Sequence, residues 1–471
     1  MLPVTRALGV DVGTTNTKVA VVEIAGSEVR ELRVLRRPTA GDGDGIRTAV
    51  RGLVRDAVET LGGAPVAAIG IASMAETGAL LDADGRSIGA LLRWDAARPG
   101  GTVEPGLSER TGVPRPEKST RALVAAALPG RRGAVSWAGG AELAALALIG
   151  RAVTDPTLAL RTMLATLPRL GEPVAWDAEL LAATGLPGEA LPRILVAGET
   201  VALDHAAARS LGLPAGIPVA IAGHDHAVAT WAAGMREPGE TGDSIGTAEA
   251  LVRIAAGEID RTAAIAEGMS VGRTVDGRYE TLVGGIPAAS RLLAELAGRV
   301  GGDEPADSFA GPIMLPTPAG RQAPRPDGAA VLRAITPDGA DASIPTDPAV
   351  AARAVSAGLA LQARWIAAAQ DRVLGSPATR TVVTGAAHAV AGPWWAAKRR
   401  LSPALLARTT GIAEPVAAGA ALLAAVRAGL GESGIRLPVD VAPLDLDPGA
   451  DDLLAAFVAA SLDHHLTPET S

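Results

Sequence analysis

Cysteine is absent from this 471-residue chain, which excludes disulfides, thiolate nucleophiles and cysteine-ligated metal sites. Aromatic residues are scarce, with seven Trp, two Phe and one Tyr, so each tryptophan has to be considered individually. Hydrophobic residues make up 48% of the chain, but much of that share is alanine. No uninterrupted apolar run approaches the roughly 18 residues that a membrane span needs. These absences predict a protein that has no membrane partner.

An excess of positive charge is also missing. The formal net charge is −8 and the pI is near 5.4. Such a surface repels phosphate backbones, so we expect no nucleic-acid partner. The first ten residues run directly into a predicted strand and lack the longer apolar segment of a signal peptide, which predicts a cytoplasmic location. The length predicts two or three domains around a large core.

Apolar patterns predict alternating strands and helices. Strands are expected at residues 7–11, 18–24, 66–72, 217–221, 251–254 and 381–385. Helices are expected at residues 46–61, 353–373, 414–430 and 452–462, and the section 120–200 is predicted to be mostly helical. Residues 317–348 are rich in Pro, Gly and Asp and are expected to form loops. The pattern is typical of an α/β protein.

The opening theme of strand, carboxylate and Gly-Thr turn recurs in residues 216–247. The repeat predicts two similar lobes, at residues 1–238 and 239–435, followed by a C-terminal tail at residues 436–471.

Asp225 follows the apolar residues 217–221 and stands beside a glycine in the sequence AGHDH, residues 222–226. A carboxylate at the C-terminal end of a buried strand is where α/β enzymes place a general base. The alternative is that Gly-Asp marks a turn and nothing more. His224 and His226 flank the carboxylate without the convergent spacing of a zinc site, so we expect no metal other than magnesium.

Two turns of the phosphate-binding type flank Asp225 in the sequence, DVGTTNTK at residues 11–18 and DSIGT at residues 243–247. The first leaves several backbone N–H groups unpaired and pointing one way, which suits a polyphosphate. Asp11 can hold Mg²⁺ through water, and Lys18 can reach a phosphate as a point charge. Either turn alone could be a polar hairpin turn. Together with Asp225, the two predict a nucleotide clamped between the lobes.

These motifs, in this order and spacing, resemble the FGGY family of carbohydrate kinases, within the actin and hexokinase superfamily. The resemblance covers about residues 6–430 and lies in GVDVGTTNTK at 9–18, IGIASMAET at 69–77, WDAAR at 94–98, TDPTLALRT at 154–162, GHD at 223–225, GT at 246–247, PTPAGRQAP at 316–324 and TGAA at 384–387. It implies two ribonuclease-H-like lobes of the actin/hexokinase ATPase type with a cleft between them. It also implies an enzyme that uses ATP and Mg²⁺.

The resemblance implies a role for each site residue. Asp225 would bind the substrate and accept a proton from its attacking hydroxyl, and Asp11 would hold the magnesium. The other expected substrate-binding residues are Glu76, Trp94, Asp95 and Arg98. The expected nucleotide-binding residues are Gly13, Thr14, Thr15, Lys18, Gly246, Thr247, Gly385 and Ala386. Glu76 could instead be a solvated turn residue, Trp94 a core residue and Arg98 a structural cation.

The chain departs from the family pattern at two places that bear on ligands. The glycine-rich adenine turn reads Gly-Ala-Ala from residue 385, and a methyl group there could narrow the pocket. At the strand end that faces the sugar, this chain has Ala75-Glu76. The substrates of xylulose or glycerol kinases should therefore not be assigned to this chain by resemblance.

We therefore predict an ATP-dependent kinase of a small sugar or polyol, with a ketose such as a pentulose as the expected substrate. The alternatives are a glycerol, erythritol or aldonate kinase on the same fold, or a degenerate sugar- or nucleotide-binding sensor. A homodimer is one of the assemblies open to it.

Overall fold

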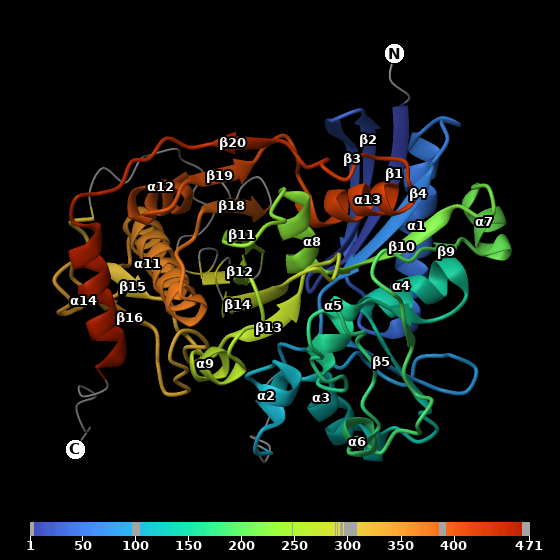
Figure 1. Ribbon diagram of the computed structural model, residues 1–471, viewed down its shortest axis with the longest axis horizontal. Helices are drawn as coiled ribbons and strands as arrows, with labels where there is room; N and C mark the ends of the chain where they lie inside the picture. The colour runs from blue at the N-terminus through green and yellow to red at the C-terminus, as the bar shows by residue number, and fades with distance from the viewer. Residues whose placement is uncertain are drawn as a thin grey trace.

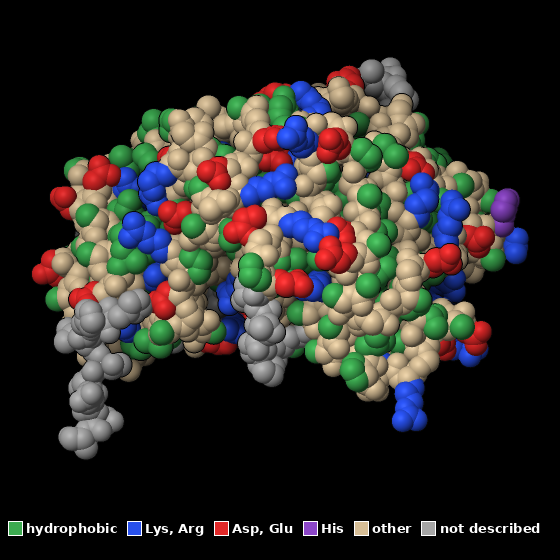
Figure 2. Space-filling view, turned by 60° about the horizontal axis from the view of Figure 1, so that its bottom comes forward, with side chains coloured by type: hydrophobic (Ala, Val, Ile, Leu, Met, Phe, Trp, Pro, Cys, Tyr) green, Lys and Arg blue, Asp and Glu red, His purple; other side chains and the backbone are tan. Residues whose placement is uncertain are grey.

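Two mixed β-sheets lie side by side in the computed structural model, and helices cover their faces (Figure 1). The structure describes residues 4–96, 104–246, 248–287, 289, 291, 292, 295, 309–385 and 392–463. Basic and acidic side chains are interspersed over the face drawn in Figure 2. Among the described residues, no helix is both long enough and apolar enough to cross a bilayer.

The first sheet has six strands in the order β3-β2-β1-β4-β10-β9. They are β3 (Glu28–Pro38), β2 (Asn16–Ala25), β1 (Val4–Val12), β4 (Ala68–Ser73), β10 (Pro218–His224) and β9 (Val201–Ala202). Strands β1, β2 and β3 form an antiparallel meander, whereas β4 and β10 run parallel to β1. Strand β4 is buried along its whole length and β1 is buried from Ala7 onward, as an apolar strand covered on both faces must be.

The second sheet repeats this arrangement with the order β13-β14-β12-β11-β18-β19-β20. Its strands are β13 (Ser270–Arg273), β14 (Glu280–Ile286), β12 (Glu249–Ile254), β11 (Glu240–Ile245), β18 (Arg380–Gly385), β19 (Leu406–Thr409) and β20 (Val439–Val441). Strands β11, β12 and β14 form the antiparallel part, and β18 and β19 run parallel to β11. The repeated topology confirms the predicted α/β fold with two related lobes.

Helices close both faces of the first sheet. On one face lie α1 (Gly43–Thr60), α4 (Gly140–Ile149) and α7 (His205–Leu211), and on the other α8 (Asp225–Ala232) and α13 (Pro415–Arg427). Helix α1 begins at an Asp42 N-cap, whose side chain accepts from the backbone N–H of Gly45 at 2.8 Å. The predicted helix at residues 46–61 is confirmed and begins three residues earlier.

The second sheet carries α11 (Pro348–Leu374) and α12 (Gly392–Leu401), and α14 (Ala450–Leu462) packs against α11. Phe457 of α14 meets Trp365 of α11 edge to face, with ring centroids 6.5 Å apart. Residues beyond 435 therefore pack with the second sheet, through β20 and α14. The division of the chain at residues 238/239 and 435/436 stays a prediction.

The prediction that residues 120–200 are mostly helical is wrong. Only short helices form there: α3 (Thr120–Ala127), α4, α5 (Pro156–Ala159) and α6 (Ala178–Ala182). Between them run the short strands β6 (Ser136–Gly139), β7 (Val153–Thr154) and β8 (Arg193–Ile194), and β6 pairs with β5 (Gly78–Leu81). Helix α3 ends just before Pro129, which cannot donate a backbone hydrogen bond, and α4 ends at Gly150 in the left-handed conformation.

The remaining elements border the cleft or the second sheet. They are α2 (Leu107–Thr111), α9 (Arg261–Ala266), β15 (Ile313–Leu315), β16 (Arg333–Ile335) and β17 (Asp341–Ala342). The last two strands lie in the section 317–348 that was expected to form loops.

Helix α13 lies against the first sheet with no room for side chains between them. A Cβ atom added to Gly9 would stand 1.7 Å from the backbone oxygen of Ala417, and one added to Gly70 would stand 1.9 Å from that of Ala420. Both obstacles are backbone atoms, so neither can swing aside. Small residues on α13, including Gly419, make the same approach possible against α8.

Gly70→Ala should therefore lower the free energy of unfolding by about 1–3 kcal/mol through overpacking, as measured by urea denaturation. Gly188→Ala is the matched control, because a Cβ at Gly188 meets no atom within 4 Å. Equal stability of the two variants would contradict the close packing of α13.

Candidate active site

A cleft of about 820 Å³ lies between the two sheets and is lined by residues of both lobes. Its lining includes ten of the residues predicted from the sequence: Asp11, Gly13, Thr14, Thr15, Lys18, Glu76, Trp94, Asp225, Gly246 and Gly385. The structure thus brings together segments that lie far apart in the chain. Arg98, Thr247 and Ala386 lie outside the described residues.

Asp225 is held at the C-terminal end of β10, where it begins α8. The register of β10 against β4 shifts between Ile221 and Gly223. Gly223 has φ of 128°, and a Cβ there would lie 2.5 Å from Oγ1 of Thr157. The next backbone N–H, that of His224, donates to the same Thr157 oxygen at 2.8 Å. Glycine is thus required for the strand end to turn Asp225 into the cleft.

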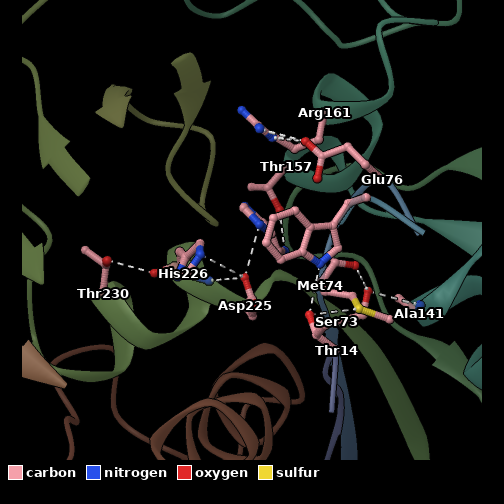
Figure 3. Close-up of polar contacts among 12 residues, drawn as sticks. Thr14, Ser73, Met74, Glu76, Ala141, Thr157, Arg161, Asp225, His226 and Thr230 are labelled. Atoms are coloured by element: carbon pink, nitrogen blue, oxygen red, sulfur yellow. Dashed lines mark hydrogen bonds and ion pairs between the residues drawn. The ribbon is translucent and has the colours of Figure 1, made fainter. Parts of the chain in front are cut away.

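The Asp225 carboxylate is surrounded by nitrogen atoms (Figure 3). Its Oδ1 accepts from the backbone N–H of His226 at 2.7 Å, and Nε2 of His224 lies 3.1 Å away. Burial favours a higher pKa, but the His226 and His224 side chains and the His226 backbone N–H outweigh it, so the pKa of Asp225 is lowered. Asp225 is therefore ionised at neutral pH.

The two histidines converge on this carboxylate more closely than their spacing in the sequence led us to expect. One ligand atom each from His224, Asp225 and His226 lie within 4.8 Å of one another, and Nε2 of His226 is 3.8 Å from Asp225 Oδ1. Burial lowers the pKa of His224 to about 3, so this imidazole is uncharged at neutral pH. Its contact with Asp225 is that of a neutral ring.

Glu76 extends from the end of β4 with a left-handed backbone, φ 54°. A non-glycine residue in this region carries strain that the surrounding structure has to support. Arg161 supplies the support, since its Nε donates to Glu76 Oε1 at 2.8 Å. Burial raises the pKa of Glu76 although Arg161 acts against it. The structure thus excludes the reading of Glu76 as a solvated turn residue.

Trp94 connects the sugar side of the cleft to the first phosphate-type turn. Its indole Nε1–H donates to Oγ1 of Thr14 at 2.9 Å, and that hydroxyl in turn donates to the sulfur of Met74 at 3.4 Å. The Thr14 hydroxyl, which we expected to serve phosphate, is therefore engaged within the protein (Figure 3). The backbone of this turn remains the part that faces the cleft.

Asp95 is not among the described residues that line the cleft. Arg93 binds its carboxylate in a two-point contact, with distances of 2.9 Å from Nε and 3.0 Å from Nη2. The same guanidinium points at the backbone oxygen of Thr14. In this structure Asp95 orients Arg93, and its expected contact with substrate stays a prediction.

Asp11 and Lys18 face each other across the first hairpin, where they are register partners. The Lys18 ammonium lies 3.3 Å from Asp11 Oδ2 and 2.7 Å from Oε2 of Glu414, the N-cap residue of α13. Burial favours a lower pKa for Lys18, but the two carboxylates outweigh it and raise the value. Lys18 lines the cleft while two anions neutralise its charge.

Asp11 has the properties expected of a magnesium ligand. It is buried at the end of β1, and burial raises its pKa to about 6 in spite of Lys18, with Asp225 and Glu414 adding to the rise. Because burial disfavours the ionised form of Asp11, an added cation would stabilise that form, and Mg²⁺ prefers oxygen ligands of this kind. The residues present therefore fit the metal.

The second lobe presents glycines to the cleft and a buried charge cluster beneath them. A Cβ at Gly385 would lie 2.4 Å from the side chain of Ile245, so β18 and β11 meet closely at this rim. Below it, the Lys398 ammonium contacts the carboxylates of Asp243 and Glu249, and all three residues are buried. Burial raises the pKa of Glu249 to about 8, which Lys398 only partly opposes. One proton and one ammonium together neutralise two carboxyl groups.

Comparison with known proteins gives an independent result for the N-terminal half. Residues 132–232 match the N-terminal domain of the FGGY family of carbohydrate kinases. The L-fuculokinase of Escherichia coli K12 is 39% identical over 106 residues, which cover 22% of this chain and 21% of that protein. The L-fuculokinase of Salmonella typhi is 40% identical over 114 residues, or 24% and 23% of the two chains. The chain thus matches less than a quarter of the length of these curated relatives.

Solved structures extend the likeness to the whole fold. A xyloylose kinase from Brucella ovis superposes with a TM-score of 0.80 at 19% identity over 97% of both chains. A gluconate kinase from Lactobacillus acidophilus gives 0.79 at 19% identity over 97% of both chains. The Plasmodium falciparum glycerol kinase with ADP gives 0.78 at 17% identity over 98% of both chains. The chain therefore shares the fold of these kinases, and its residues 132–232 match the N-terminal domain of the FGGY family of carbohydrate kinases.

Sequence reasoning missed several charged side chains that line this cleft, among them Arg115, Lys118, Arg161 and Glu414. Arg161 lies inside a segment, residues 154–162, that resembled the family, but charge pairing with Glu76 left no signal in the sequence. Glu414 stands immediately before Pro415, a residue typical of a first helical turn. That position marked it as a helix N-cap and not as a partner of Lys18.

Lys398→Met should lower the free energy of unfolding by about 3–5 kcal/mol, because Asp243 would be left buried without a counter-ion. Glu249→Gln should instead raise it at pH 7, since the amide replaces a protonated carboxyl of the same shape and needs no proton uptake on folding. Chemical denaturation at pH 7 measures both.

The same pair predicts a pH dependence. The folded-state pKa of Glu249 is raised above the unfolded value of 4.5, so its contribution to stability is complete below that value and is lost as the pH rises toward 8. Relative to Glu249→Gln, the wild type should lose stability from about pH 5 to about pH 8. A constant difference over that range would show that Glu249 is ionised in the folded protein.

Proposed function

We propose that this protein transfers the γ-phosphoryl group of ATP to a hydroxyl of a small sugar or polyol, with Asp225 as the general base. The observation that carries the proposal is the position of the ionised Asp225 in a cleft that both phosphate-type turns also line. The match of residues 132–232 to the FGGY family of carbohydrate kinases supports the reaction class, and the ketose expected from the sequence is retained as a candidate substrate. The cytoplasmic location and a homodimer stay predictions.

The proposed reaction needs positioning more than covalent chemistry from the protein. Asp225 accepts the proton of the attacking hydroxyl while the oxygen bonds to the γ-phosphorus and the bond to the bridging oxygen of ADP breaks. Hydrogen bonds from the His226 backbone and support from Thr157 hold the carboxylate in place for this transfer. Glu76, itself held by Arg161, can accept from two neighbouring hydroxyls of the substrate.

On the nucleotide side, the turns at Gly13 and Gly246 line the cleft and would face the phosphates. The N–H groups of these two glycines donate within their own turns, to the backbone oxygens of Asn16 and Ala248, so other backbone N–H groups would have to serve the phosphates. Asp11 would hold magnesium, which neutralises charge on the β- and γ-phosphates when it is bound. The Lys18 ammonium would then weaken its contact with Asp11 and bind a phosphate oxygen. Approach of the two lobes would exclude water and limit hydrolysis of ATP.

Asp225→Asn should reduce sugar-dependent ADP release by at least about 100-fold while the dissociation constant for ATP changes little, because the amide keeps the shape but cannot take a proton. A coupled assay over pentuloses, hexuloses, polyols and aldonates measures turnover, and calorimetry measures nucleotide binding. Turnover that persists in Asp225→Asn would show that Asp225 is not the general base. Nucleotide binding without turnover of any substrate by the wild type would favour a sensor.

The magnesium requirement should depend on pH through Asp11. Its pKa of about 6 means that the carboxylate is lost to protonation as the pH falls through that value, and a proton then competes with the metal. The Mg²⁺ concentration for half-maximal activity should stay level from pH 8 to pH 7 and rise steeply below about pH 6. A flat profile down to pH 5.5 would assign the metal to other ligands.

A further inference from the structure

The end of the cleft near Glu76 carries more positive than negative charge. The cationic side chains that line it there are Arg115, Lys118 and Arg161. Arg161 is neutralised by Glu76, and Arg115 donates from Nε to Glu117 Oε1 at 2.9 Å. No described residue forms a hydrogen bond or ion pair with the Lys118 ammonium. One positive charge is thus left over on this side.

The position of Lys118 is fixed by the fold and not by a partner. It ends the turn Pro116–Lys118, and the next residue, Ser119, is the N-cap of α3 and accepts from the backbone N–H of Ala122. Lys118 is more than half buried, and burial followed by the charge of Arg115 lowers its pKa. Glu117, Glu76 and Asp95 act on the pKa of Lys118 in the opposite direction, and Lys118 lines the cleft together with Glu76.

A neutral sugar would not offset the cost of holding the Lys118 ammonium half-buried beside Arg115. Hydroxyl groups are served as well by Glu76 and by neutral donors, and a half-buried ammonium beside a guanidinium has a cost that only an anion relieves. A carboxylate has two oxygens and can accept from both Lys118 and Arg115. Arg115 can supply the Nη donors that its contact with Glu117 leaves uncommitted.

We propose that the substrate is a sugar acid, an aldonate or ketoaldonate, whose carboxylate binds Lys118 and Arg115 while the hydroxyl to be phosphorylated lies at Asp225. This inference rests on the proposed kinase function and narrows it. The carboxylate stays unchanged in the reaction, and the product carries both the carboxylate and the new phosphate ester. Lys118 and Arg115 are specificity residues in this scheme, and Glu76 reads the hydroxyl groups between the two ends.

The test is ADP release with pairs of substrates that have equal carbon number, one a neutral ketose or polyol and the other the corresponding aldonate or ketoaldonate. The wild type should use one acid with a kcat/KM at least about 10-fold above that of its neutral counterpart. Lys118→Met should raise KM for that acid roughly 10- to 100-fold with little change in kcat. It should leave the neutral partner unaffected, and Lys118→Arg should restore most of the loss.

Arg86→Met is the matched control, because Arg86 is largely exposed, pairs with Asp84 and lies outside the cleft. It should leave KM for the acid unchanged. Increasing salt should weaken binding of the acid in the wild type and not in Lys118→Met. The comparison of acids with neutral sugars uses the wild-type protein, so it stands even where a variant folds poorly.

Two results would overturn the inference in different ways. Turnover of a neutral sugar with no use of its acid, unaltered by Lys118→Met, would reject the sugar acid and leave the kinase proposal standing. Absence of turnover with every neutral and acidic substrate would reject both. Equal use of acid and neutral partner would also count against the assignment, because it would show that Lys118 contributes nothing to recognition.

Discussion

The direct contact between α13 and the first sheet is the constraint on which the site depends. Gly9 and Gly70 remove the side chains that would otherwise separate helix and sheet. The N-terminal end of α13 places Glu414 against Lys18. At the other end, Arg427 donates to the backbone oxygens of Ile221 and Val275 at 2.6 and 2.8 Å. A late segment of the chain thus sets the geometry at the ends of β1 and β10, where the acidic residues of the cleft lie.

Charge in the cleft is balanced by sharing between neighbours and not by isolated pairs. Lys18 contacts two carboxylates and Lys398 contacts two more, whereas Asp225 lies beside the uncharged His224 and accepts from the backbone N–H of His226. Because one ammonium contacts two carboxylates, both carboxylates can be buried and can still bind another cation or proton. The different surroundings of these neighbouring acids also explain why their pKa values move in opposite directions, upward for Asp11 and downward for Asp225. This ability to bind a further cation or proton suits a site that would take charged ligands.

Much of the fold was predictable because its strands and long helices have strong apolar patterns. The hairpin at Asp11, the strand before Asp225 and the helix at residues 353–373 were found in this way. Strand β3 was missed because it carries four arginines, at positions 30, 33, 36 and 37, and sits at a sheet edge. Ten of the site residues expected from the motifs line the cleft, and their roles stay predictions. Arg161, Glu414 and Lys118 could not be found, because their roles come from contacts between segments that are far apart in the chain.

The hydrogen bond from Trp94 to Thr14 ties the wall of one ligand site to the turn that forms the other. Neither residue can move without stretching this bond or carrying its partner along. If ligands at the two ends of the cleft each act on this bond, their binding equilibria are linked, and linkage requires the two ligands to change each other's affinity by the same factor. An indole and a hydroxyl would in this way act as a thermodynamic coupling element, so that the order in which the two ligands arrive leaves their joint binding energy unchanged.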